Sequence, residues 1–176
     1  MALACGREAQ SNDGMTFFQR MAVASITVAL AGTGFAQQLA TKRALTLEVA
    51  KKLAAAAEAE AAKNKFTMYI TIVDDGGIPV YIAKMDDTQI GSYEVSIAKA
   101  QSAVNFKRPT KAFEDAVVGG RTAILKLPGA IPVEGGVPLM ADGKVIGAIG
   151  VSGGSSVQDG QVAAVAVAAF EAMLKK

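Results

Sequence analysis

The sequence predicts an α+β domain in which helices cover the faces of a mainly antiparallel sheet. Ala-rich stretches with a helical period alternate with short β-branched stretches, and such helices need a sheet face to bury their apolar sides. Tight Asp-Gly turns join the β stretches in pairs, which makes neighbouring strands antiparallel. The chain has 176 residues, 51% of them apolar, which suits one domain with a real core. The expected order is α-ββ-α-α-βββ-α.

The first expected helix runs from Leu47 to Lys63. Thr46 is a good N-cap, and Asn64 ends the helix. One face carries small apolar residues at helical spacing, so the helix should pack against something flat. That face consists of Leu47, Ala50, Leu53, Ala54, Ala57 and Ala61.

A β-hairpin is expected next, with strands at 66–74 and 78–85 around the turn Asp74-Asp75-Gly76-Gly77. Pro79 has no amide hydrogen for a ladder, so it belongs in the first turn of its strand or at a sheet edge. Three helical segments should follow, with Ser92 and Thr110 as the caps of the first two. Their expected ranges are 93–106, 111–118 and 121–125.

The last third of the chain returns to β structure before a final helix. Gly147 and Gly150 interrupt the last strand, and close approach of another backbone or of a ligand usually explains such glycines. The final helix opens with a capping-box pattern at Ser156 and Asp159 and is apolar almost all round, which indicates a subunit interface. The expected strands are 131–133, 137–141 and 144–152, and the helix is 158–174.

Residues 15 to 36 have the pattern of a secretory signal peptide. Met15 to Arg20 is a short segment with one positive charge, and Met21 to Ala31 is an uncharged apolar run of 11 residues. Small residues at Gly34 and Ala36 favour a cut after Ala36. We therefore expect a periplasmic or secreted protein.

Other interpretations of the leader fit less well. A buried amphipathic helix would show a polar face, and a permanent membrane span would not be thinned by Ser, Thr, Gly and Gln. A lipoprotein needs a cysteine directly after the cut, where Gln37 stands. Residues 1–14 fit neither leader nor fold, which indicates that Met15 is the true start. A flexible lead-in at 37–44 and a domain at 45–176 complete the expected organisation.

The composition restricts the chemistry of the mature chain. The sequence has no histidine, which excludes imidazole bases, imidazole zinc ligands and His-ligated haem iron. The single cysteine, Cys5, lies upstream of the expected cut, so the mature protein has no thiol for a disulfide, a metal site or a nucleophile. A net charge of +2 and 6% aromatic residues argue against a nucleic-acid partner.

Two acidic groups are candidates for proton transfer if the protein is an enzyme. Asp74 and Asp75 could bind a metal or act as an acid/base couple, although neighbouring strand residues point to opposite faces and turn chemistry explains the pair better. Glu134 precedes Gly135 and Gly136, whose amides could face an anionic ligand. A simple chain reversal between strands explains the same glycines, and no phosphate-binding glycine motif is present.

Basic residues gather around the end of the expected 93–106 helix. They could hold carboxylates, such as haem propionates or a small organic acid. Basic residues near a helix C-terminus also stabilise its dipole without any ligand, so both explanations stay open. The cluster consists of Lys99, Lys107, Arg108 and Lys111.

Four segments taken in order resemble the GlcG/HbpS-like family, which also occurs as the C-terminal part of some PduO-type corrinoid adenosyltransferases. They are VDDGG at 73–77, KAQSA at 99–103, EGGVPL at 134–139 and GAIGVSG at 147–153, within a match from about Leu45 to Phe170. The resemblance implies a three-layer, profilin-like α/β/α fold and homo-oligomers. It also implies that some members bind haem or a related tetrapyrrole, while others accompany glycolate or diol metabolism.

The resemblance also implies a binding site, with one departure. Some haem-binding relatives use a histidine near the metal, so ligation here would fall to Met, Tyr, Lys or a hydroxyl. The family's RPT segment matches Arg108-Pro109-Thr110, where a haem could dock with weak hydroxyl ligation. The expected binding residues are Lys99, Arg108, Thr110, Glu134, Gly135 and Gly136. Further candidate ligands are Tyr69, Tyr81, Tyr93, Met68, Met85 and Met140.

Three functions stay open at this point. The first is an exported, non-catalytic protein that binds haem or another tetrapyrrole and assembles with copies of itself. The second is an enzyme or accessory factor for a small carboxylate in a glycolate- or diol-type pathway. There, Lys99 or Arg108 would anchor the acid, and Asp74 or Glu134 would move a proton. The third is a structural oligomer with a vestigial pocket.

Overall fold

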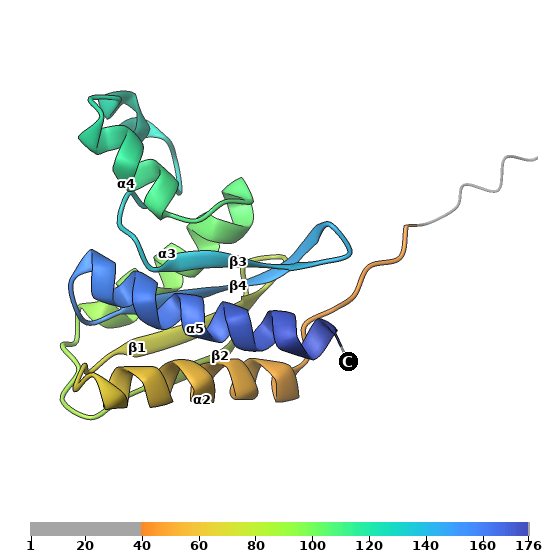
Figure 1. Cartoon of the computed structure of the whole chain (residues 1–176). Coiled ribbons are helices and arrows are strands. Elements are labelled where there is room, and N and C mark those ends of the chain that lie inside the picture. Colours follow the sequence, from red (N-terminus) through yellow and green to blue (C-terminus); the bar gives the residue numbers. More distant parts are fainter. Residues whose placement is uncertain (1–39, 176) are drawn as a thin grey trace, which may run out of the picture. The chain divides into compact units, whose positions relative to one another are not determined.

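A computed structural model describes residues 40–175, so the expected leader, its cut and residues 1–14 lie outside the described part. The elements are α2 (Leu47–Lys63), β1 (Tyr69–Asp74), β2 (Pro79–Lys84), α3 (Ser92–Phe106), α4 (Lys111–Val118), the 3-10 helix η1 (Thr122–Lys126), β3 (Gly136–Ala141), β4 (Lys144–Ser152) and α5 (Ser156–Leu174). The described part of the chain begins with a short irregular stretch before α2 and ends with helix α5 (Figure 1).

In this part of the chain, four strands form one antiparallel sheet in the order β2-β1-β4-β3. Two hairpins build the sheet, and the β1–β4 ladder joins them, with Ile72 opposite Ile149. Pro79 is the first residue of the edge strand β2, as expected for a residue that has no amide hydrogen to donate. The mainly antiparallel sheet predicted from the sequence is confirmed.

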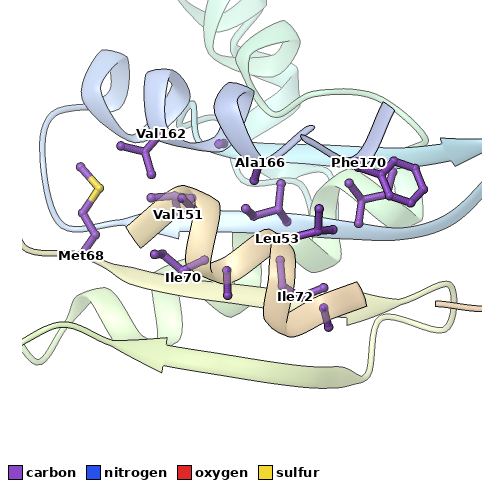
Figure 2. Packing of buried hydrophobic residues seen from close by; sticks show 14 of the residues in the cluster. Leu53, Met68, Ile70, Ile72, Val151, Val162, Ala166 and Phe170 are labelled. Atoms are coloured by element: carbon purple, nitrogen blue, oxygen red, sulfur yellow. The ribbon is translucent and has the colours of Figure 1, made fainter. Parts of the chain in front are cut away.

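Helices α2 and α5 lie side by side on one face of the sheet (Figure 1). Thr46 caps α2, because its hydroxyl accepts a hydrogen bond from the Val49 amide at 3.3 Å. The small side chains of α2 are buried and let its backbone approach the strands. Figure 2 shows the resulting core, with Leu53, Val162, Ala166 and Phe170 from the helices packed on Ile70, Ile72 and Val151 from the strands.

Helix α3 covers the opposite face, so the fold has the three layers that the resemblance implied. Val73 and Ala148 point towards Ala100 on this side of the sheet. At Gly150 the α3 backbone is so close that a Cβ atom would lie 2.0 Å from the Ser96 carbonyl oxygen. The close approach that the sequence predicted at Gly150 is therefore that of the α3 backbone to strand β4.

Residues 109–127, which contain α4 and η1, form an arm that projects from the sheet (Figure 1). Lys107 turns the chain from α3 towards the arm, with a left-handed φ of 52°. Phe113 is the buried residue of α4, and its ring meets that of Phe106 edge-on at a centroid distance of 5.1 Å. This aromatic pair attaches the arm to the end of α3.

The structure corrects two local expectations. The stretch Ile131 to Val133 was expected as a strand, but it is irregular, and the Ile131 amide donates to the Ser102 hydroxyl at 3.1 Å. Leu47 was expected on the buried face of α2, but it is 50% exposed, because the buried face begins one turn later at Ala50.

The start of α5 also differs from the expectation. The helix begins at Ser156, and Ser155 and Gln158 form its capping box. Asp159, the expected partner in that box, turns into the interior instead. Among the described residues, α5 is the helix long and apolar enough to cross a membrane, with a mean hydropathy of 1.2. Because Val162, Ala166 and Phe170 belong to the core, its composition is that of a core helix.

Replacing Gly150 with alanine should lower the free energy of unfolding by about 1–3 kcal/mol, because overpacking forces α3 away from the sheet. Urea unfolding followed by circular dichroism measures the change. Gly91→Ala is the matched control, since a Cβ atom at Gly91 meets nothing within 4 Å. Equal stability of the Gly150→Ala and Gly91→Ala variants would contradict the close approach of α3.

Candidate functional site

The interior of the domain holds a buried ion pair between α3 and α5. Lys99 is 1% exposed and Asp159 is 2% exposed, and Lys99 Nζ lies 2.6 Å from Asp159 Oδ2. The ammonium also donates to the Val151 carbonyl oxygen at 3.1 Å, and the Gly154 amide donates to Asp159 Oδ1 at 3.0 Å. The pair thus joins α3, the end of β4 and the first turns of α5.

Burial dominates the electrostatics of this pair. Loss of solvent raises the pKa of the Asp159 carboxyl above its ordinary value, while Lys99 and the amides of Gly154 and Gly153 act in the opposite direction. In a buried pair, the cost of dehydration offsets most of the attraction between the charges. We therefore expect the pair to fix the arrangement of three elements more than to add net stability.

The loop at 134–136 closes over the ion pair. Gly135 has a φ of 126°, and a Cβ atom there would lie 2.6 Å from the Val151 carbonyl oxygen and 3.0 Å from Lys99 Nζ. A Cβ atom at Gly136 would lie 2.3 Å from the Lys99 carbonyl oxygen. Both glycines are therefore required by close packing of protein atoms.

Thr110 holds this loop in place from the start of the arm. Its amide donates to the Gly136 carbonyl oxygen at 2.9 Å, and its hydroxyl accepts from the Gly136 amide at 3.0 Å. Thr110 occupies the N-cap position of α4, but its hydroxyl serves Gly136 and makes no hydrogen bond to the helix. The side chain is fully buried, so its use as an iron ligand stays a prediction that requires these hydrogen bonds to open.

Glu134 lies at the surface between α4 and the start of α5. Its amide donates to the Glu114 carboxylate, and its Oε2 lies 3.9 Å from Lys111 Nζ. A Cβ atom at Gly160 would lie 2.1 Å from Glu134 Oε1, so this glycine makes room for the carboxylate. The hydrogen bond from Lys111 to Asp115 raises the pKa of Lys111, and the Glu134 charge adds to that rise.

Arg108 lies apart from the ion pair, directly before the arm. Its guanidinium carbon is 5.7 Å from the centre of the Phe113 ring, and its Nε donates to the Phe106 carbonyl oxygen at 3.2 Å. A hollow of about 160 Å³, called the arm hollow below, lies beside it and has a second arginine in its wall. The lining residues are Phe106, Arg108, Ala112, Phe113, Ala116, Arg121, Ile124 and Leu127.

Asp74 lies at the β1–β2 turn, where its Oδ1 accepts from the amides of Gly76 and Ile78, both at 2.9 Å. This is the turn role that the sequence favoured. Asp74 pairs with Gly147, whereas the loop of Glu134 enters the sheet opposite Gly150. The two candidate acids therefore stand at different ends of the sheet.

The structure brings together most of the site residues predicted from the sequence. Arg108 and Asp74 lie outside this group. Asp159 and Arg121 were not among the predicted site residues, although a lone lysine among the small residues of α3 signals a need for a buried acid. Within residues 40–175, no three His, Cys, Asp or Glu side chains gather as a metal site requires. The residues that lie together are Lys99, Thr110, Glu134, Gly135 and Gly136.

A family model described as haem degrading protein HbpS-like matches residues 45–168. The chain belongs to this HbpS-like family. Protein GlcG of Escherichia coli K12 is 41% identical over 112 residues, which cover 64% of this chain and 84% of GlcG. The resemblance predicted from the four sequence segments is confirmed.

Solved structures of HbpS-like proteins share the fold. Protein ORFY of Klebsiella pneumoniae has a TM-score of 0.70 and 33% identity, over 77% of this chain and 97% of that one. A PduOC:heme complex has a TM-score of 0.66 and 32% identity, over 72% of this chain and 95% of the other. The second of these contains haem.

The arm and the ion-pair region differ in the room that they offer a haem. Around Lys99 the glycine loop leaves no space, because even a Cβ atom would collide with neighbouring atoms. The arm hollow, about 160 Å³, is smaller than the roughly 300–1,000 Å³ of pockets that enclose drug-sized ligands. Arg108 and Arg121 suit the propionates. The arm hollow is therefore too small to enclose a whole haem.

Replacing Lys99 with methionine should lower the free energy of unfolding by about 3–5 kcal/mol, because the Asp159 carboxylate would be buried without its partner. The double variant Lys99→Met/Asp159→Asn should recover part of this loss, since the asparagine side chain is neutral and its oxygen still accepts from the Gly154 amide.

Urea unfolding of the single and double variants measures this coupling. Lys52→Met is the matched control, because it breaks an exposed ion pair within α2 that contributes little to stability. A double variant no more stable than Lys99→Met would argue against a destabilising lone carboxylate.

Proposed function

We propose that this HbpS-like protein is exported and binds haem or a related tetrapyrrole through its arm. The observation that carries the proposal is the arm hollow, whose wall combines two arginines with aromatic and aliphatic side chains. A haem edge has the matching chemistry, with two carboxylates on a flat apolar ring. The haem in the related PduOC complex and the description of the family support the same ligand class.

The arm would hold the ligand in two ways. Arg108 and Arg121 would each donate paired hydrogen bonds to a propionate, for which a planar guanidinium is well shaped. Phe106 and Phe113 would supply an apolar surface for the macrocycle. Bound haem would bring redox-active iron to the arm, and these arginines and phenylalanines would bind and orient it.

A second copy of the chain would cover the rest of the macrocycle. The arm exposes apolar side chains at Val118 and Leu125, with 83% and 58% of their surfaces accessible, and α5 exposes Val157 and Val165. Assembly into a homo-oligomer would remove such surface from water. We therefore include self-association in the proposal.

The size of the arm hollow also favours a second candidate function. A hollow of about 160 Å³ accommodates a small organic acid completely, and the two arginines would anchor its carboxylate. Glu134 and Asp74, the two predicted proton-transfer groups, do not line the arm hollow, so this candidate rests on the two arginines as the anchor of the acid. This alternative uses the same arginines with a different ligand.

Titration of the purified protein with hemin should give a saturable shift of the Soret band. Arg108→Ala and Arg121→Ala should each weaken binding at least tenfold, because a hydrogen bond to a charged group is worth roughly 1.5–3 kcal/mol and about 1.4 kcal/mol is a factor of ten. Lys51→Ala is the control, since it removes one positive charge from an exposed site on α2.

Two results would overturn the tetrapyrrole proposal. One is the absence of a saturable Soret shift at micromolar hemin. The other is equal weakening by Lys51→Ala, which would indicate general attraction between charges. Saturable binding of glycolate, lost in both arginine variants and without any hemin binding, would favour the second candidate.

Expression of the whole chain in a bacterial host should release a mature protein that begins at Gln37. Ala36→Arg should block this processing, because signal peptidases require a small residue before the cut. Mass spectrometry of periplasmic and cytoplasmic fractions measures both results, with Gln38→Arg as the control. Accumulation of unprocessed wild-type protein in the cytoplasm would contradict export.

A further inference from the structure

A second and larger hollow lies at the hairpin end of the sheet. Its volume is about 360 Å³, within the roughly 300–1,000 Å³ typical of small-molecule sites. Lys107 lines it, whereas the neighbouring residues Phe106 and Arg108 line the arm hollow. It is called the lysine hollow below. Its lining residues are Lys42, Asp75, Val104, Lys107, Met140, Gly143, Lys144 and Val145.

The charges around the lysine hollow are strongly unbalanced. The lining contains three lysines and a single carboxylate, that of Asp75, which forms an ion pair with Lys42. Lys107 forms no ion pair with any acid in residues 40–175. The lining therefore carries a formal charge of +2, summed over these four groups. A dianion would neutralise it.

Lys42 completes the wall of the lysine hollow, and its neighbours Thr41 and Arg43 hold it in place. Lys144 Nζ donates to the Thr41 carbonyl oxygen at 3.0 Å, and Arg43 pairs with Asp142 at 3.0 Å. These contacts hold the lead-in segment beside the β3–β4 turn, and the ion pair of Lys42 extends it to the β1–β2 turn. The hollow is thus built from segments far apart in the chain.

We propose that the lysine hollow binds a small phosphate monoester with an apolar body. Such a monoester carries a charge of about −1.5 to −2 at pH 7, which matches the lining. Lysine ammoniums bind phosphate as point charges, and the arginine beside the hollow, Arg43, is already engaged by Asp142. Val104, Met140 and Val145 provide an apolar wall for the body of the ligand. This proposal uses no residue of the arm hollow, so it stands independently of the proposed function.

The test uses phenyl phosphate as the ligand and Lys107→Asn as the variant. Asparagine tolerates the left-handed conformation that residue 107 adopts, so this change removes the charge without straining the turn. Lys65→Asn is a matched control, because Lys65 also has a left-handed φ, 59°, and lies outside the hollow. Lys42→Gln is a second variant within the hollow.

NMR titration of the purified protein measures affinity and location together. We expect the methyl signals of Val104, Val145 and Met140 to shift, and the affinity to fall at least tenfold in Lys107→Asn and in Lys42→Gln. Lys65→Asn should bind like the wild type. Unchanged affinity in both hollow variants, or an equal loss in Lys65→Asn, would overturn the proposal. Equal affinity for benzoate would overturn the assignment to phosphate.

Discussion

The Lys99 ammonium lies in the interior of the domain, and the surrounding structure is arranged to compensate that one charge. Asp159 turns inward from α5 to meet it, which leaves Ser155 and Gln158 to cap the helix. The end of β4 supplies a carbonyl oxygen, and the Gly135-Gly136 loop comes close enough to exclude water. Thr110 then fixes that loop to the start of the arm. A single buried cation thereby determines how α3, α5, β4 and the arm meet.

This arrangement separates the rigid centre of the domain from the surfaces that offer room to a ligand. The RPT segment, which resembles the family's binding segment, therefore has two separate roles. The Thr110 hydroxyl accepts a hydrogen bond from the Gly136 amide and holds the glycine loop, whereas Arg108 lines the arm hollow. The left-handed turn at Lys107 directs neighbouring side chains to two different hollows.

Much of the fold could be predicted from local sequence signals. The Asp-Gly turns fixed the hairpins, and the small residues of α2 indicated the face that packs on the sheet. Gly150 signalled a close approach, but its cause, the α3 backbone, depends on tertiary contacts. Asp159 was hidden for the same reason, since an acid near a helix start suits a cap as well as a buried pair. Arg121 could not be placed beside Arg108, because only the fold of the arm brings them together.

The order of the strands has a consequence for how the chain folds. Each hairpin joins residues that are neighbours in sequence, so both can form early and independently. The central ladder between β1 and β4 pairs residues from opposite halves of the domain. Closing so long a loop costs chain entropy before the contacts that stabilise it have formed. Until that ladder closes, α3 has no complete surface on which to pack and the Lys99 charge has no partner. We therefore expect the slow step of folding to coincide with burial of the ion pair, and a chain stalled before it would expose the inner edges of both hairpins.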